Sequence, residues 1–423
     1  MAPLSLFLIS LAVVAVAVPQ HPELSPFDEY VYTDYIAKVP SQFVVHQGEQ
    51  TGEYARDQLD CRGVLILGPT PFNCGPATTI PPQDGLTSAD IYSPLYFVIT
   101  RAVAQPLVWA GVELVDAARL AGGVWLGLGA VLLFLLLTRL WVPRMLAWGL
   151  AGIVIASPVA HWSNTYISTD APSLAAGAGV SLLGVLVYQR RAHPAWLAAA
   201  SAFIVLLKFQ NIIAVALVAI VFVVFGIREA ATGHDDRGLR RLPRIVRSRP
   251  VVVAAVVLLV AFVTQVVWMS VRSAISDGPS PVQGVDVPLT KTELLLQAFN
   301  FFRLMPLGFT ESSKAPVDLV VGIILVTITT AGVIGMIFSG KSGSPQSIIA
   351  GCALFASMAS APVLAIVVYL AVGEYAELRP RYGQSLLAAF VLCSGWLLAQ
   401  KKWSSPVVAG GAGILLVASM LTT

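Results

Sequence analysis

Two adjacent carboxylates follow the first apolar segment of the chain, in the stretch FDEY (Phe27–Tyr30). A carboxylate close to a membrane boundary has a raised affinity for protons or needs a cation partner, because the low dielectric disfavours an isolated charge. Asp28 and Glu29 are therefore candidates for holding a proton or a cation for chemistry at the membrane surface. Short acidic motifs also occur by chance in solvated loops, so a surface role is the alternative.

A pair of arginines near the other end of the chain could complement these acids. Arg379 and Arg381 flank a proline in the stretch LRPRYG (Leu378–Gly383), and Tyr382 follows them. Arginine binds phosphate with a planar fork and keeps its charge near lipid. The same residues could instead only extend their charged ends toward the membrane interface. Two arginines at the outer end of an apolar segment run against the positive-inside bias, so we expect a function for this stretch.

Three more charged positions could join such a site. Asp170 precedes an expected helix, Lys208 lies between two apolar segments, and Arg303 falls in the amphipathic stretch Thr290–Met305. Two of these positions have an alternative: Thr169 or Asp170 could cap the helix, and Lys208 could merely mark the surface. We predict substrate or lipid-phosphate contacts for all three.

The sequence lacks a P-loop, a dinucleotide fingerprint, an HExxH motif and any Cys/His metal spacing. An ATP-driven pump is therefore not indicated, and no metal ligands are expected. His46 and His161 are isolated and are expected to be surface residues. We predict that no cofactor is required, with a divalent cation as the alternative.

The composition indicates a membrane protein. Of the 423 residues, 57% are hydrophobic and 12% are charged, whereas soluble domains have roughly 25% charged residues. Runs such as Gly122–Trp141 approach the length of about 20 residues that crosses a bilayer. The alternation typical of barrel strands is absent. We predict an all-α, polytopic transmembrane helical bundle.

The apolar segments predict about eleven spans in a single domain, 1–423. The first, Pro3–Val18, could be a cleaved signal peptide, but a retained helix is favoured. Leu95–Leu120 is expected to be a helix at the interface, because charged residues interrupt it. The other spans are expected at 121–140, 145–160, 173–187, 195–207, 212–226, 251–271, 317–338, 347–372, 386–398 and 407–421.

Charge predicts the sidedness of these spans. The loop 227–250 contains seven arginines, and the positive-inside rule assigns such loops to the cytoplasm. Contact with anionic lipid explains these arginines better than nucleic acid does. The extracytoplasmic face then receives a long first loop, 19–93, and the loops 161–172, 273–316 and 373–385. The unusual polar residues all fall on this face, so we expect function there.

The four cysteines divide into two kinds. Cys352 and Cys393 lie in apolar segments and are expected to be inert. Cys61 and Cys74 share the first long loop. If that loop faces an oxidising compartment, a disulfide between them is plausible, and two free thiols are the alternative.

These motifs resemble those of the GT-C superfamily of polytopic membrane glycosyltransferases. FDEY (Phe27–Tyr30), YSPLYF (Tyr92–Phe97), STDAP (Ser168–Pro172) and LRPRYG (Leu378–Gly383) stand in the places and order of that family's short motifs. The Ala- and Val-rich composition resembles actinobacterial members. Two features depart from the family pattern: no histidine directly precedes Ser93-Pro94, and no large soluble domain is expected after the spans.

The resemblance implies an enzyme of cell envelope biosynthesis, acting at the outer face of a bacterial plasma membrane. It would transfer a sugar, with inversion, from a polyprenyl-phosphate donor to an envelope glycan or lipid acceptor. Asp28 or Glu29 would be the base, and Arg379 and Arg381 would bind the lipid phosphate. The alternatives are a transporter or lipid carrier that uses Asp28, Asp170 and Glu374 as ion sites, and a non-catalytic protein with this fold.

Overall fold

The computed structural model describes residues 1–26, 28–64, 82–231, 242–281, 289–304, 316–341, 343–372, 375 and 378–422. Within these residues the chain forms helices and no strand. The helices are α1 (Ala2–Ala17), α2 (Glu29–Gln42), α3 (Glu53–Arg62), α4 (Leu95–Trp109), α5 (Leu114–Arg139), α6 (Arg144–Ile155), α7 (Pro158–Thr165), α8 (Ser173–Tyr188), α9 (Pro194–Leu207), α10 (Ile212–Ala231), α11 (Leu242–Arg247), α12 (Arg249–Ala274), α13 (Lys291–Phe299), α14 (Pro316–Ser339), α15 (Pro345–Val372), α16 (Leu387–Ala399) and α17 (Ser404–Thr422).

Short 3₁₀ and π-helical turns connect these helices. They are η1 (Val18–Gln20), η3 (Pro82–Gly85), η4 (Ala89–Ile91), η5 (Phe209–Asn211), η7 (Asn300–Leu304) and η9 (Pro380–Leu386). Two isolated bridges, Leu24 with Val64 and Gln50 with Leu86, tie the first long loop together.

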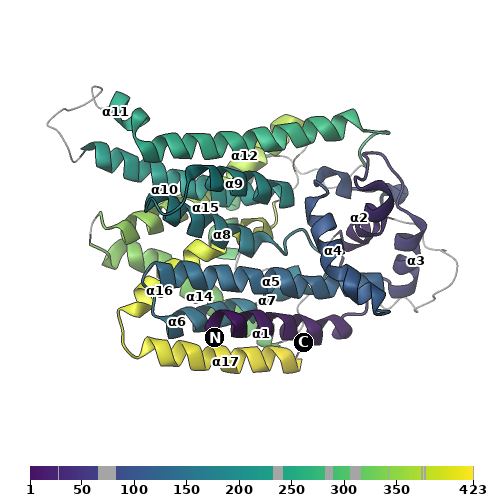
Figure 1. The fold of residues 1–423 in the computed structure, drawn as a ribbon, viewed down its shortest axis with the longest axis horizontal. Coiled ribbons are helices and arrows are strands. Elements are labelled where there is room, and N and C mark those ends of the chain that lie inside the picture. Colours follow the sequence, from purple (N-terminus) through teal and green to yellow (C-terminus); the bar gives the residue numbers. More distant parts are fainter. Residues whose placement is uncertain are drawn as a thin grey trace.

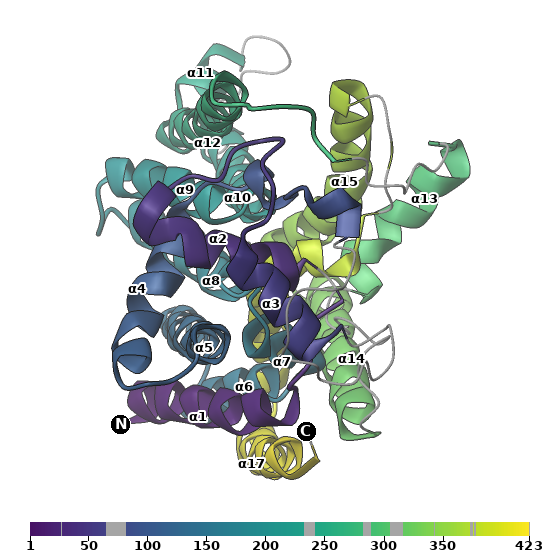
Figure 2. The ribbon, with the colours of Figure 1, turned by 90° about the vertical axis from the view of Figure 1, so that its right-hand side faces the viewer.

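The long helices lie side by side in one bundle (Figure 1). Helices α2 and α3 cover one end, which we call the loop end. The arginine-bearing helix α11 lies at the opposite end, which we call the basic end. The view onto the loop end shows α2 and α3 crossing the middle of the bundle (Figure 2). The arginines of α11 therefore lie at the end of the bundle away from α2 and α3.

Eight helical segments in the described residues are long and apolar enough to cross a membrane. A ninth crossing results if α6 and α7, which meet at a bend of 59°, are one broken span. Helices α8 and α9 have 16 and 14 residues and are shorter than the usual span. The chain is therefore a multi-pass membrane protein. The sequence-based number of about eleven spans remains a prediction.

The expectation of one interfacial helix over Leu95–Leu120 is wrong. The segment is divided into α4 and the first part of α5, and α5 continues to Arg139. Gly111 has a φ of +89°, which residues other than glycine rarely adopt, and it ends α4. The Glu113 side chain then accepts a hydrogen bond from the Val115 N–H and caps α5. Local turn chemistry at Gly111 and Glu113 thus divides the segment into two helices.

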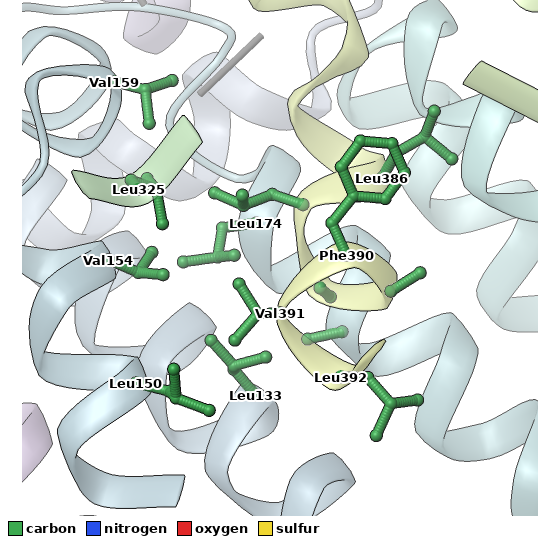
Figure 3. Close-up of a cluster of buried hydrophobic side chains, with 14 of the residues drawn as sticks. Leu133, Leu150, Val154, Val159, Leu174, Leu325, Leu386, Phe390, Val391 and Leu392 are labelled. Atoms are coloured by element: carbon green, nitrogen blue, oxygen red, sulfur yellow. The ribbon is translucent and has the colours of Figure 1, made fainter. Parts of the chain in front are cut away.

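The core is built from side chains of helices far apart in the sequence. Figure 3 shows Leu133 of α5, Leu150 and Val154 of α6, Leu174 at the start of α8, and Phe390 of α16 directed into one apolar cluster. Small residues let the backbones approach closely, as is usual between membrane helices. Helix α1 packs on α5 where Gly123 and Gly127 leave room for Leu11 and Phe7.

The loop end is attached to the bundle by aromatic and ionic contacts. The Tyr35 ring of α2 stacks on Phe97 of α4 with centroids 4.0 Å apart. Arg62 at the end of α3 pairs with Asp116 and Glu113 near the start of α5, at 2.8 and 2.9 Å. These contacts hold the first long loop over the ends of the helices that carry the other polar motifs.

Candidate functional site

Four charged side chains from distant parts of the chain meet at the loop end. We call Asp28, Asp170, Lys208 and Arg381 the charged cluster. Each residue stands where a helix begins or two helices join: Asp28 before α2, Asp170 in the turn before α8, Lys208 between α9 and η5, and Arg381 in η9. Connecting segments at one end of a bundle are where side chains can meet without crossing the apolar core.

Asp170 is the centre of the charged cluster. The Lys208 ammonium donates a hydrogen bond to its Oδ1, and the Arg381 Nε lies 3.4 Å from its Oδ2. All three side chains are buried. Helix α8 begins after Pro172 without a side-chain cap, and the Asp170 carboxylate faces the two cations instead. The capping alternative from the sequence therefore does not describe this residue.

The Tyr382 ring lies against both cations of the charged cluster. The Lys208 Nζ is 4.8 Å from the ring centroid, and the Arg381 Cζ is 5.4 Å from it. A cation near an aromatic face is stabilised by the ring quadrupole, more so where water is excluded. Tyr382 therefore helps to hold two buried positive charges beside each other.

Asp28 is the member of the charged cluster whose carboxylate faces open space. Its side chain is 43% exposed, and its Oδ2 lies 3.7 Å from the Arg381 Nη2. The backbone at Asp28 has a φ of 63°, a left-handed conformation that aspartate tolerates better than most residues. Helix α2 begins with the next residue, so this turn separates the two adjacent carboxylates.

Tyr32, one turn into α2, donates a hydrogen bond of 3.4 Å to the Asp28 carboxylate. Burial raises the pKa of Tyr32 well above its ordinary value, so the phenol keeps its proton and remains a donor. The Tyr92 ring packs edge-on against Tyr32 with centroids 5.6 Å apart. The sequence analysis did not single out Tyr32, although it belongs to the same acidic and aromatic stretch as Asp28.

Glu29 lies apart from the charged cluster. Its side chain is fully buried and pairs with Arg119 of α5 through two hydrogen bonds of 2.8 and 2.9 Å. The backbone N–H groups of Ser25 and Ile167 also donate to its two oxygens, at 2.6 and 2.9 Å. Both carboxylate oxygens are thus occupied, and the geometry favours Asp28 over Glu29 as a proton acceptor.

Arg119 is a further residue that the sequence analysis did not single out. It also donates to the backbone carbonyls of His21 and Glu23, so it connects the first loop, α2 and α5. An unpaired charged residue within a largely apolar helix has a high free-energy cost. The presence of Arg119 in such a helix was therefore the signal in the sequence that could have identified it.

The YSPLYF stretch supports the segment that leads to Asp170. The Ser93 hydroxyl donates to the Leu206 carbonyl at 2.6 Å, which ties the start of α4 to the end of α9. The Tyr96 hydroxyl accepts a hydrogen bond of 3.1 Å from the Ser168 N–H. This stretch therefore positions the elements around the charged cluster.

The other predicted site residues are placed differently. Arg379 is half-buried at the start of η9 and forms no ion pair with the described carboxylates, so Arg381 is the arginine that meets Asp28. Arg303 lies in η7, which packs against η9, but its side chain is outside the described part of the chain. Glu374 is also outside the described residues.

His161 is not the surface residue that the sequence suggested. It is buried in α7, and its Nδ1 lies 3.7 Å from an oxygen of Asp318 in α14. The prediction was wrong because the segment after Ala160 continues as a helix that packs into the bundle.

The cysteines follow the predicted division in part. Cys352 and Cys393 are free and buried. Cys61 is disulfide-bonded, and Cys74 lies outside the described residues.

Among the residues that the structure describes, no group of three or more His, Cys, Asp or Glu side chains is arranged to hold a metal ion. The two alternatives for a cofactor, none or a divalent cation, stay predictions.

No protein-family model and no curated protein matches the sequence. Solved structures match it in fold. The crystal structure of ArnT from Cupriavidus metallidurans bound to undecaprenyl phosphate aligns with a TM-score of 0.51 at 15% identity, covering 97% of this chain. The archaeal oligosaccharyltransferase AglB from Archaeoglobus fulgidus, in complex with an inhibitory peptide and a dolichol-phosphate, aligns with a TM-score of 0.45 at 12% identity, covering 99% of this chain.

This chain spans 62% of the ArnT chain and 55% of the AglB chain. A third structure, the Archaeoglobus fulgidus oligosaccharyltransferase in complex with Zn and sulfate, aligns at 12% identity with a TM-score of 0.43, covering 98% of this chain and 51% of that one. The match to ArnT confirms the GT-C resemblance as a shared fold. The actinobacterial character stays a prediction.

Proposed function

We propose that this chain, a membrane protein with the GT-C-like fold that ArnT shares, transfers a sugar from a polyprenyl-phosphate donor to an acceptor at the loop end. The observation that carries this proposal is the position of Arg381 between Asp28 and Asp170, with Lys208 on the other side of Asp170. One exposed carboxylate beside two buried cations is what the reaction requires.

In the proposed reaction, an acceptor hydroxyl attacks the anomeric carbon of the sugar from the side opposite the phosphate. The hydroxyl proton passes to Asp28 as the new carbon–oxygen bond forms. The bond between the anomeric carbon and the phosphate oxygen breaks, and its electron pair leaves with polyprenyl phosphate. The configuration at the anomeric carbon is therefore inverted.

Arg381 is placed to interact both with the proton acceptor, Asp28, and with the leaving phosphate. Arg381 lies 3.7 Å from Asp28, whose negative charge disappears when it takes the proton. The leaving phosphate gains a negative charge in the same step. Arg381 stays cationic throughout, so it can bind the negative charge that the leaving phosphate gains while Asp28 is neutralised.

Asp170 and Glu29 act as positioning residues in this proposal. Asp170 balances part of the charge of Lys208 and Arg381 and keeps both side chains in place before the donor arrives. Glu29 anchors the start of α2 through Arg119 and the Ile167 backbone, so that Asp28 is presented beside Arg381. Arg379 and Arg303 remain candidates for contact with the lipid phosphate.

The basic segments support an extracytoplasmic site in a bacterial plasma membrane. Helix α11, with Arg244 and Arg247, lies at the end of the bundle opposite α2 and α3 (Figure 1). Under the positive-inside rule the charged cluster would face away from the cytoplasm, where lipid-linked donors meet envelope glycan or lipid acceptors.

The test is the Asp28→Asn variant, with Asp57→Asn on the exposed face of α3 as the matched control. The purified protein would receive a panel of radiolabelled undecaprenyl-phosphate sugars, with membrane extract as the source of acceptors. Loss of a general base lowers turnover by about 10²- to 10⁴-fold, so Asp28→Asn should fall by this factor while still binding undecaprenyl phosphate. Equal turnover in the two variants would exclude Asp28 as the base.

A further inference from the structure

An apolar cavity of about 350 Å³ extends into the bundle from the basic end. Helices α5, α8, α10, α15 and α16 form its walls, with side chains such as Leu136, Leu217 and Leu392. Its volume is in the range of sites that bind small molecules. Trp141 and Tyr188 line it at the basic end, and Leu217 and Ala389, near the starts of α10 and α16, line it on the side toward the charged cluster.

A small polar pocket of about 60 Å³ adjoins this cavity. Tyr188 and Phe222 line both spaces, so they form a common wall. Arg190 and Arg249 line the polar pocket, and α12 begins there, so the positive end of its helix dipole also points to it. Glu229 is the acidic side chain in its lining, and it accepts a hydrogen bond of 3.1 Å from the Tyr188 hydroxyl.

The backbone at the mouth of these spaces is strained in two places. Trp141 follows α5 with a φ of 70°, and Arg190 follows α8 with a φ of 58°. Glycine is the usual residue in this left-handed position at the end of a helix. Trp141 is among the residues that line the apolar cavity, and the residue as a whole is 90% exposed, as suits an indole at a membrane interface. Strained backbone conformations of this kind are concentrated at functional sites.

We propose that the two spaces together bind an anionic glycerophospholipid from the leaflet at the basic end. An acyl chain fills the apolar cavity, and the phosphate lies between Arg190 and Arg249 at the start of α12. Arginine and a helix N-terminus both favour phosphate. The two arginines exceed the single glutamate in the pocket lining, which favours an anionic lipid over a zwitterionic one. The phosphate position between Arg190 and Arg249 is at the other end of the bundle from the charged cluster.

The test uses the full-length protein, purified and delipidated, in native mass spectrometry with phosphatidylglycerol or phosphatidylcholine. Phosphatidylglycerol should be retained at least tenfold better than phosphatidylcholine. The double variant Arg190→Gln/Arg249→Gln should lose this preference, whereas Arg191→Gln, an exposed neighbour outside both pockets, should keep it. Ser181→Leu, which narrows the apolar cavity, should reduce retention of both lipids, and Ser339→Leu on the exposed end of α14 should not.

A photoreactive acyl chain provides a readout that does not depend on the variants. Phosphatidylglycerol that carries a diazirine in its chain should crosslink to peptides from α8 and α10 around Ser181 and Val221. Equal retention in the double variant and in Arg191→Gln would overturn the proposal, as would crosslinks found only at the loop end. Preferential capture of undecaprenyl phosphate at Ser181 would also overturn it. Sugar transfer is not measured, so the outcome is independent of the proposed enzyme activity.

Discussion

At the scale of single residues, two neighbouring carboxylates have different surroundings because a helix begins between them. Asp28 keeps a left-handed backbone outside α2, and its carboxylate reaches Arg381. Glu29 is the first residue of α2, and its side chain turns into the protein toward Arg119. Under the proposed function, Asp28 would accept the proton and Glu29 would hold the loop.

The Glu29→Gln variant tests this division. It would leave the buried Arg119 without its carboxylate, and breaking a buried ion pair costs about 3–5 kcal/mol. We expect a clearly lower unfolding temperature for the detergent-solubilised protein. Glu53→Gln, which changes an exposed glutamate at the start of α3, is the matched control. If both variants unfold at the wild-type temperature, the pair does not anchor the loop.

At the scale of the elements, close helix contacts determine where the cations stand. Helix α8 approaches η9 at Gly177, where an added Cβ would lie 1.9 Å from the Ser385 carbonyl oxygen. Arg381 is in the first turn of η9, four residues earlier in the chain. The absence of a side chain at Gly177 therefore permits the packing that brings Arg381 to Asp170.

We predict that Gly177→Ala forces η9 away from α8. An overpacked contact of this kind costs about 1–3 kcal/mol, and displacement of Arg381 should weaken binding of undecaprenyl phosphate. Thermal unfolding and lipid-phosphate binding would be measured together. Gly179→Ala on the same helix is the control, because its Cβ would only reach an ordinary contact at 3.5 Å from Leu132. Equal lipid-phosphate binding by the two variants would contradict the role assigned to Gly177.

At the scale of the whole molecule, the charged cluster and the arginines of α11 lie at opposite ends of the bundle. The charged cluster and α2 and α3 occupy the loop end, and α11 lies at the basic end (Figure 1). Transporters usually place their charged groups near the middle of the membrane, within broken helices. The charged cluster lies at helix ends instead, which favours chemistry at the membrane surface over passage through the bundle.

Cysteine labelling tests the sidedness of the bundle. We expect Asp57→Cys in α3 to react with a membrane-impermeant maleimide in intact cells. Arg247→Cys in α11 should react only after the membrane is permeabilised, because the positive-inside rule assigns α11 to the cytoplasm. The unsubstituted protein gives the background from the native cysteines, of which Cys352 and Cys393 are buried. The reverse labelling pattern would exclude an extracytoplasmic charged cluster.

The sequence alone determined the class of the protein and the position of most helices. The length of the apolar runs and the clustering of arginines depend on neighbouring residues, so a linear reading captures them. The same reading identified Asp28, Asp170, Lys208 and Arg381 as candidates. It joined Leu95–Leu120 into one helix because the apolar pattern outweighed the turn signal at Gly111.

Only the tertiary structure decided which of these residues meet. Arg381 faces Asp28, while Arg379 lies at the start of η9 without a described ionic partner, although both were predicted from the same motif. Glu29 pairs with Arg119, 90 residues away in the chain, and His161 is buried beside Asp318. Such contacts depend on the direction of each side chain around its helix and on the packing of distant helices, and no local pattern in the sequence specifies either.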